Sequence, residues 1–276
     1  MKKGRQSLKT PFSEITNPGK KIKDWYGLPF AKVFSNELDL PSAFLSSYKK
    51  KYNDLELKGR VQLLSELTDF HLTGTYPEKL ERLKVLFGPE WPYEEGMLGY
   101  GFHLYPVSQF AEMYGARDVR ATISFAEELT KRFTSEFVMR TVANHSPDIA
   151  MRAVKKWTKD RNFHVRRLAS EGMRARLPWG KSVQWITENP EKTIPVFSYL
   201  RNDSSLYVRR SVANAMGDIV KLNEDLAMET FQKWLSEKNT KENLWVISHA
   251  IRHPVKKKRR KFVLLRKEIE GLKRQF

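Results

Sequence analysis

The stretch from His164 to Trp179, HVRRLASEGMRARLPW, sets the fold that this chain is expected to adopt. A related phrase, YVRRSVANAMGDI, returns from Tyr207 to Ile219, and aligning the two Val-Arg-Arg units gives an offset of 43 residues. A period of about 40–47 residues is typical of paired helices that stack on one another. The two phrases therefore predict a helical repeat.

The apolar pattern extends this prediction along the chain. From Asp118 onward, helix-length segments alternate with turns, and no stretch shows the alternation that a strand requires. Residues 87–110, rich in Gly, Pro and aromatic residues, are expected to be irregular. The sequence predicts an all-α, right-handed α-solenoid of HEAT-like repeats with a concave binding face. The expected organisation is a basic N-terminal tail at 1–24, a single solenoid domain at 25–255 (N-terminal helical part 25–117, repeat part 118–255) and a basic C-terminal segment at 256–276.

The composition excludes several classes of protein. A hydrophobic content of 40% with seven Trp excludes wholesale disorder, and the absence of Cys excludes disulfides and thiolate chemistry. The N-terminus lacks the apolar run of a signal peptide, and no stretch reaches the ~18 apolar residues of a membrane span. The His residues are scattered, and nucleotide-binding motifs are absent. We expect a cytoplasmic monomer without metal or cofactor.

The net charge of +18 indicates a polyanionic partner. Most of the excess lies at the two ends of the chain. Residues 1–24 carry seven Lys and Arg against two acids, and residues 251–276 carry eleven against two. Charge alone leaves open whether these ends contact phosphates or are simply solvated.

Helical phase predicts a polar surface opposite the packing side of the repeats. Residues four apart lie on one helix face, and an arginine recurs there with an acid or amide. Three helices carry the pattern, as Glu136/Arg140, Arg167/Glu171 and Arg210/Asn214/Asp218. One such pair can be an ordinary ion pair worth a few tenths of a kcal/mol. Three pairs in register instead indicate a shared polar surface.

Arginines beside carboxylates suit a ligand that is polyanionic and also locally cationic. Arginines bind phosphates, whereas a carboxylate repels them unless it faces something positive, such as an alkylated nucleobase. Departure of that base leaves an oxocarbenium-like sugar, which a carboxylate stabilises or supplies with an oriented water. One charge pair at ~4 Å and an effective dielectric of ~20 is worth about 4 kcal/mol. The pattern therefore favours chemistry on alkylated bases in nucleic acid.

Four phrases resemble the AlkC/AlkD superfamily of DNA alkylation-repair glycosylases, and its AlkC branch more closely. They are RFTSEF (132–137), HVRRLASEGMRARLPW (164–179), YVRRSVANAMGDI (207–219) and WVISHAIR (245–252). The phrases cover the second half of the chain in the expected order, whereas the first half resembles the family only loosely. The resemblance implies a bacterial, DNA-associated solenoid that binds duplex DNA containing alkylated bases. It further implies a monofunctional enzyme that hydrolyses the N-glycosidic bond of positively charged N-alkylated purines, chiefly 3-methyladenine.

The same resemblance implies roles for individual residues. It places active-site carboxylates on Glu136 and Glu171, a third acid on Asp218 and an active-site tryptophan on Trp179. The arginines expected to contact DNA are Arg140, Arg166, Arg167, Arg174, Arg176, Arg209, Arg210 and Arg252. The chain departs from the family pattern at Ala175, Ala215, Gly217 and Ser248, and the immunoglobulin-like domain of some members is not expected.

Two other functions stay open at this point. A catalytically silent HEAT module could bind damaged or branched DNA, in which case arginines would remain and carboxylates would be lost. A protein-binding scaffold would instead line its concave face with apolar residues. Base excision is preferred because all three acids are present.

Overall fold

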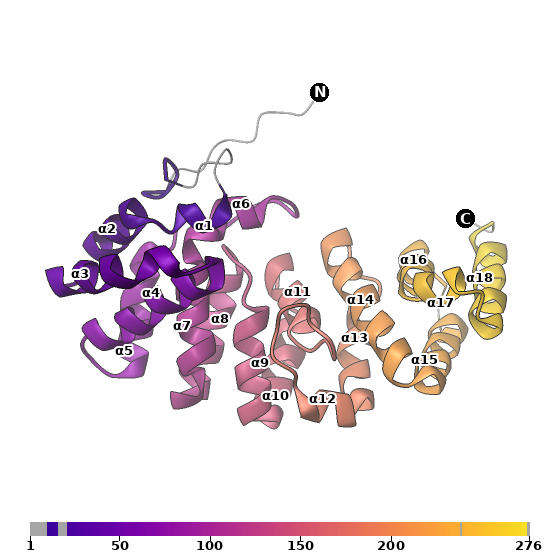
Figure 1. Cartoon of the computed structure of the whole chain (residues 1–276). Helices are drawn as coiled ribbons and strands as arrows, with labels where there is room; N and C mark the ends of the chain where they lie inside the picture. Colours follow the sequence, from indigo (N-terminus) through magenta and orange to yellow (C-terminus); the bar gives the residue numbers. More distant parts are fainter. Residues whose placement is uncertain (1–9, 16–20, 238, 275–276) are drawn as a thin grey trace. The chain divides into compact units, whose positions relative to one another are not determined.

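The computed structural model describes residues 10–15, 21–237 and 239–274. In these ranges every regular element is an α-helix or a short 3₁₀ turn, and no strand is present (Figure 1). The all-α prediction is confirmed. The chain divides into two compact units, of which the first ends at Thr141 and the second begins at Val142. No helix of the described residues combines the length and apolarity needed to cross a bilayer.

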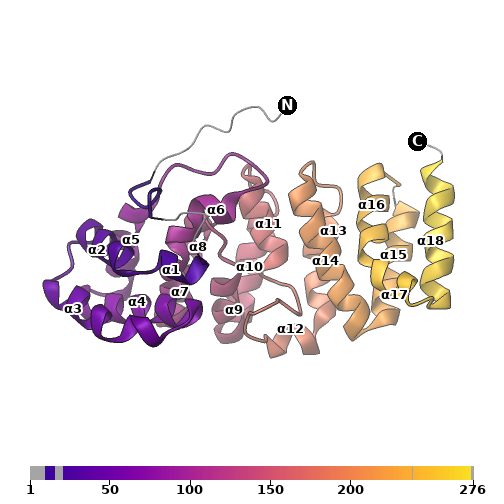
Figure 2. The ribbon, with the colours of Figure 1, turned by 45° about the horizontal axis from the view of Figure 1, so that its top comes forward.

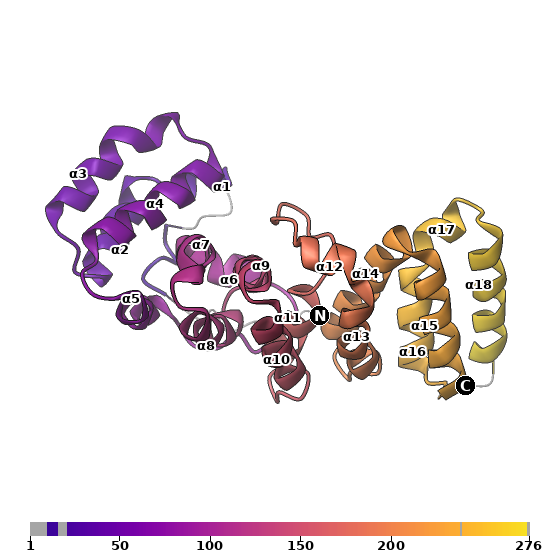
Figure 3. The ribbon, with the colours of Figure 1, turned by 90° about the horizontal axis from the view of Figure 1, so that it is seen from below.

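The first unit is built from helices that enclose an aromatic core. Its α-helices are α1 (Ile22–Trp25), α2 (Leu28–Glu37), α3 (Ser42–Lys51), α4 (Leu57–His71), α5 (Tyr76–Leu83), α6 (Met97–Gly101), α7 (Tyr105–Tyr114) and α8 (Val119–Thr130). Figure 3 shows α2, α3 and α4 lying together, and they bury Phe30, Phe34 and Phe44. Helix α9 (Glu136–His145) spans the limit between the two units.

Part of the N-terminal stretch expected to be a tail packs onto this core. Phe12 is buried, and its ring stacks on that of His103 at 5.0 Å between centroids. Burial of an aromatic ring stabilises the folded chain by about 1.5–3 kcal/mol. Residues 10–15 therefore belong to the first unit, while residues 1–9 and 16–20 of the predicted tail lie outside the described residues.

The stretch predicted to be irregular, residues 87–110, is partly helical. It contains α6, the 3₁₀ turn Phe102–Leu104 and the start of α7. Pro106 lies in the first turn of α7, where a missing N–H costs nothing, so this proline begins a helix. A Cβ at Gly101 would lie 2.1 Å from the carbonyl oxygen of Arg132, so glycine here allows a close approach of two backbones. The prediction of irregular structure was wrong for residues 97–110, whereas residues 87–96 contain no helix or strand.

The second unit consists of paired helices that stand side by side (Figures 1 and 2). They are α10 (Pro147–Trp157), α11 (Phe163–Glu171), α12 (Gln184–Glu188), α13 (Ile194–Leu200), α14 (Leu206–Leu222), α15 (Glu224–Glu237), α16 (Lys241–Ala250), α17 (Arg252–Lys256) and α18 (Arg260–Lys273). Helix α11 packs against α10, α13 and α14, and α14 packs in turn against α15 and α16. The helical-repeat prediction is confirmed here, whereas the concave face stays a prediction.

The 43-residue offset corresponds to a repeated set of hydrogen bonds. Helix α11 begins where the side chain of Asn162 accepts the N–H of His164 (2.9 Å), and α14 begins where Ser205 accepts the N–H of Val208 (3.3 Å). These N-caps satisfy helix donors that would otherwise lack a partner. The loops before the two helices therefore share one design, with equivalent residues in equivalent roles.

The first arginine of each Val-Arg-Arg unit folds back onto the loop before its helix. Arg166 Nη1 donates to the carbonyl oxygens of Asp160 (2.9 Å) and Arg161 (3.0 Å). Arg209 Nη1 makes the equivalent pair of hydrogen bonds to Asp203 and Ser204. These side chains satisfy loop carbonyls, so they belong to the fold of the repeat.

Asp203 joins one repeat to the next. It accepts two hydrogen bonds from Arg166, at 2.6 Å from Nε and 3.0 Å from Nη2, and its side chain is almost fully buried. A two-pronged, buried pair of this kind is stronger than an exposed ion pair. Because Arg166 also holds its own loop, this one contact fixes the two loops to each other.

The predicted basic C-terminal segment, 256–276, contains a packed helix. Helix α18 buries Phe262, Leu265 and Ile269 and packs against α16 and α17. In the first turn of α18, Lys261 pairs with Glu224 and Asp225 of α15, both at 3.0 Å. The charge-rich composition concealed a helical apolar spacing, so most of this segment is part of the second unit.

We expect Asp203→Ala to lower the free energy of unfolding by about 1–3 kcal/mol more than Asp160→Ala does. The side chains of both aspartates accept a backbone N–H two residues ahead, from Ser205 (2.9 Å) and Asn162 (2.7 Å), but only the side chain of Asp203 also accepts from Arg166. Thermal and urea unfolding of the two variants measure the difference. Equal destabilisation would show that the contact between repeats contributes nothing.

Candidate functional site

Glu171, the last residue of α11, is held between α11 and α14. Its side chain is buried, and each oxygen has a defined partner. Arg174 Nη1 donates to Oε1 at 2.8 Å, and Ser211 Oγ of α14 donates to Oε2 at 2.6 Å. Both carboxylate oxygens are therefore fixed in direction.

Arg174 is shared between two carboxylates. Its Nη1 reaches Glu171, and its Nε donates to Oδ2 of Asp218 on α14 at 2.9 Å. Arg167, one turn before Glu171 on α11, lies farther away, with Nη2 at 3.5 Å from Oε1. The structure thus brings together four of the predicted residues, Arg167, Glu171, Arg174 and Asp218, in one charged cluster.

The two acids of this cluster have different electrostatics. Burial alone would raise the pKa of Glu171, but Arg167, Arg174 and the hydrogen bond from Ser211 together hold that pKa below its ordinary value. Burial raises the pKa of Asp218, because the hydrogen bond and charge of Arg174, which it shares with Glu171, offset only part of its desolvation. Glu171 is therefore the acid of this pair that stays ionised most readily.

The serines of this site were missed by the sequence prediction. Ser170 Oγ donates to Ser211 Oγ at 2.7 Å, and Ser211 in turn donates to Glu171. A signal was present, because Ser211 occupies the position that Leu168 holds one repeat earlier. A small hydroxyl in place of a buried leucine indicates a polar partner inside the repeat.

Trp179 lies in the loop after α11 and is strongly exposed, at 86% of its surface. Its φ of 63° is left-handed, which costs a bulky residue about 1–3 kcal/mol. The next residue closes a tight turn, in which Gly180 N donates to the carbonyl of Leu177 at 3.1 Å. An aromatic ring is therefore presented to solvent from a strained backbone, a combination found often at functional sites.

The predicted DNA-contacting arginines fall into different environments. Arg176 and Arg210 are exposed, and Arg252 donates to Asn214 Oδ1 at 3.1 Å. Arg140 is fully buried, and Arg166 and Arg209 are engaged with loop carbonyls. These last three side chains are engaged within the fold, and their contacts with phosphates stay a prediction.

Glu136 and Arg140 belong to α9. Glu136 is its first residue, and both side chains are buried. Their register with Glu171 and Asp218 stays a prediction. In the described residues, no three His, Asp or Glu side chains are grouped as a metal site would require.

The chain is similar to an uncharacterized bacterial protein and to a solved DNA glycosylase. No family model matches the chain. Uncharacterized protein YhaZ of Bacillus subtilis (strain 168) is 33% identical over 204 residues, which are 74% of this chain and 54% of that protein. This chain thus spans about half the length of that curated relative. The structure of the alkylpurine DNA glycosylase AlkC of Pseudomonas fluorescens, bound to DNA containing an abasic site analog, matches with a TM-score of 0.77 and 26% identity over 89% of this chain and 67% of that one.

We expect Glu171→Gln to reduce the dependence of stability on acid pH. A carboxyl group with a lowered folded-state pKa stabilises the fold above its unfolded pKa of about 4.3, and this contribution disappears as the pH falls through the folded value. Unfolding of the wild type and the variant from pH 7 to pH 3 should therefore show a gap that narrows with acid. Glu229→Gln, at an exposed position on α15, is the matched control. A constant gap would mean that Glu171 is not held ionised.

Proposed function

Because this chain belongs to the AlkC/AlkD superfamily, we propose that it is a DNA glycosylase that removes alkylated bases. The observation that carries this proposal is Glu171, a buried carboxylate with both oxygens oriented and a lowered pKa. A solved alkylpurine DNA glycosylase, AlkC, shares this fold over most of the chain. The proposed reaction is hydrolysis of the N-glycosidic bond.

In this mechanism Glu171 acts as an anion. A carboxyl group with a lowered pKa is a poor general acid at neutral pH, but it can stabilise an oxocarbenium-like sugar or orient a water molecule. The hydrogen bonds from Arg174 and Ser211 orient the group before substrate arrives. Such preorganisation avoids the cost of turning dipoles during the reaction.

The substrates that suit this arrangement carry their own positive charge. We propose N-alkylated purines, chiefly 3-methyladenine, since a cationic base already has a weakened glycosidic bond. The exposed ring of Trp179 can add a cation–π contact of about 0.5–2 kcal/mol. We propose hydrolysis without a covalent intermediate between the sugar and an amine of the protein, and therefore a monofunctional enzyme.

Duplex DNA is the proposed partner of a monomer that works in the bacterial cytoplasm. Arg176 and Arg210 are exposed and can reach phosphates without leaving a structural contact. Arg167 lies farther from Glu171 than Arg174 does, and its guanidinium lies 5.2 Å from the ring centroid of Tyr207. We propose that Arg167 also contacts DNA, while Arg174 holds the two acids.

One observation favours a second candidate, a HEAT module that binds damaged or branched DNA without catalysis. The charge of Glu171 is compensated by Arg167 and Arg174, as in a purely structural network. In that case Glu171 would contribute to stability alone. The experiments below separate the two functions.

We expect Glu171→Gln to bind duplex DNA as the wild type does and to lose base release by a factor on the order of a hundred to a thousand. Glutamine keeps the size and one acceptor but removes the negative charge. Chromatography of bases released from methylated duplex DNA under single-turnover conditions measures the loss, and Glu136→Gln tests the acid of α9. Wild-type rates in both single variants and in the double variant would show that these acids are not the catalytic groups. No release of any base by the wild type would favour the non-catalytic module.

We expect Trp179→Ala to reduce release of 3-methyladenine by about 2- to 30-fold without lowering the melting temperature. The ring is exposed, so its loss leaves no cavity. Trp179→Phe should restore part of the rate, and Tyr199→Ala, another exposed aromatic residue, should have no effect. If Trp179→Ala excises at the wild-type rate, the ring does not contact the base.

A further inference from the structure

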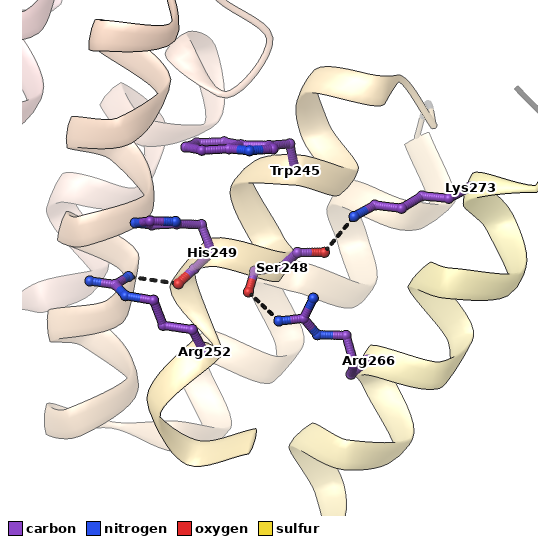
Figure 4. A pocket seen from close by; sticks show the side chains of 6 residues that line it. All are labelled: Trp245, Ser248, His249, Arg252, Arg266 and Lys273. Atoms are coloured by element: carbon purple, nitrogen blue, oxygen red, sulfur yellow. Dashed lines mark hydrogen bonds between the residues drawn. The ribbon is translucent and has the colours of Figure 1, made fainter. Parts of the chain in front are cut away.

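A pocket of about 240 Å³ lies among α16, α17 and α18 in the second unit. Six residues line it, Trp245, Ser248, His249, Arg252, Arg266 and Lys273 (Figure 4). A water molecule takes up ~30 Å³ of liquid volume, so there is room for a small anion together with bound water. Three of the six lining side chains are cationic.

These cations are held in place by neutral groups. Arg266 Nη2 donates to the carbonyl of Ser248 at 3.0 Å, and Lys273 Nζ donates to the hydroxyl of the same serine at 3.2 Å. Arg252 Nη1 donates to the carbonyl of His249 at 2.7 Å, as Figure 4 shows. Neutral partners orient the three side chains, and the carboxylate whose charge acts on Arg252, that of Asp218, does not line the pocket.

Carboxylates are missing from this pocket. Among the described residues, none lies within ion-pair distance of Arg252, Arg266 or Lys273, and no acid lines the pocket. Glu242 of α16 and Glu270 of α18 lie outside the lining. The Nε of Arg266 is buried without a hydrogen-bond partner, a state that native structures seldom leave unexplained. The pocket is therefore a concentrated positive site without its counterion.

An aromatic wall borders the cations. The rings of Trp245 and His249 stack with centroids 4.9 Å apart and an angle of 14° (Figure 4). Burial, and after it the charges of Arg252 and Arg210, lower the pKa of His249 to about 4, so the ring is neutral at physiological pH. A neutral imidazole can donate one N–H to an anion.

We propose that Arg252, Arg266 and Lys273 form an oxyanion site for a phosphate group, and that a phosphodiester of DNA supplies it. Guanidinium and ammonium groups that converge without a carboxylate are the usual recognition chemistry for phosphate. The site is close enough to Arg210 for its charge to act on His249, and the exposed lysines 256–258 precede α18. Positive charge therefore continues beyond the pocket, as a polymer backbone requires. The choice of DNA as the source rests on the proposed function.

The first arm of the test measures how binding of unmodified duplex DNA depends on salt. Lys273→Gln and Arg266→Gln should each reduce affinity several-fold and lower the slope of log K against log[salt] by about 0.9, the value for one lost phosphate contact. Lys267→Gln removes the same charge from an exposed position of α18 that does not line the pocket. It should leave the slope unchanged. Lys273 is exposed, so its substitution tests the site even if Arg266→Gln fails to fold.

The second arm uses inorganic phosphate alone, with the titration of His249 followed by NMR. A bound phosphate should raise the pKa of His249, because the anion stabilises the imidazolium form. Lys273→Gln should remove this shift, and chloride at equal ionic strength should not reproduce it. No shift together with an unchanged DNA slope overturns the site. A shift with an unchanged slope shows a site for free phosphate and overturns the assignment to DNA.

These outcomes are independent of base excision. If the wild type releases methylated bases and Lys273→Gln has an unchanged salt slope of DNA binding, the proposed function stands and the phosphate site is wrong. If the slope changes in the variants and phosphate raises the pKa of His249, but the wild type releases no base, the phosphate site stands and the glycosylase assignment is wrong.

Discussion

Arg174 is the cation that allows two acids to be buried between α11 and α14. It donates to Glu171 and to Asp218, so one guanidinium offsets part of the desolvation of both. The sharing is unequal, because Glu171 also has Arg167 and Ser211 nearby, and the pKa values of the two acids move in opposite directions. Packing of the repeat and chemistry of the site therefore depend on the same side chain.

Much of the fold could be predicted from the sequence. The 43-residue offset and the apolar spacing identified the paired helices of the second unit, and the structure confirms them. The prediction failed where residue type or composition alone was taken to decide the local structure. Pro106 begins a helix, Phe12 leaves the presumed tail to fill the core, and Ile269 sits on an apolar face within a basic segment. Tertiary packing, which sequence spacing does not report, decided the outcome for Phe12. Pro106 and Ile269 follow local signals, the first turn of a helix and a helical apolar spacing, that the prediction overlooked.

Less of the site could be predicted, because a helical wheel gives the direction of a residue and not its reach. The two arginines of Val-Arg-Arg look alike in sequence, yet Arg166 folds back to loop carbonyls while Arg167 extends towards Glu171. Likewise, Glu171 was placed on an open polar face, but it is buried, and Arg174, three residues away, donates a hydrogen bond to it. Such long side chains are positioned by their partners.

Exposed and buried charges of the second unit respond differently to the salt concentration of the solution. Ions in the medium screen exposed groups such as Arg210 within about 10 Å at 0.1 M salt, whereas a buried pair is screened far less. The network around Glu171 therefore keeps its internal field in conditions that weaken contacts made at the surface. Attachment to the proposed DNA partner can be tuned by the ionic environment while the electrostatics of the buried carboxylate stay constant.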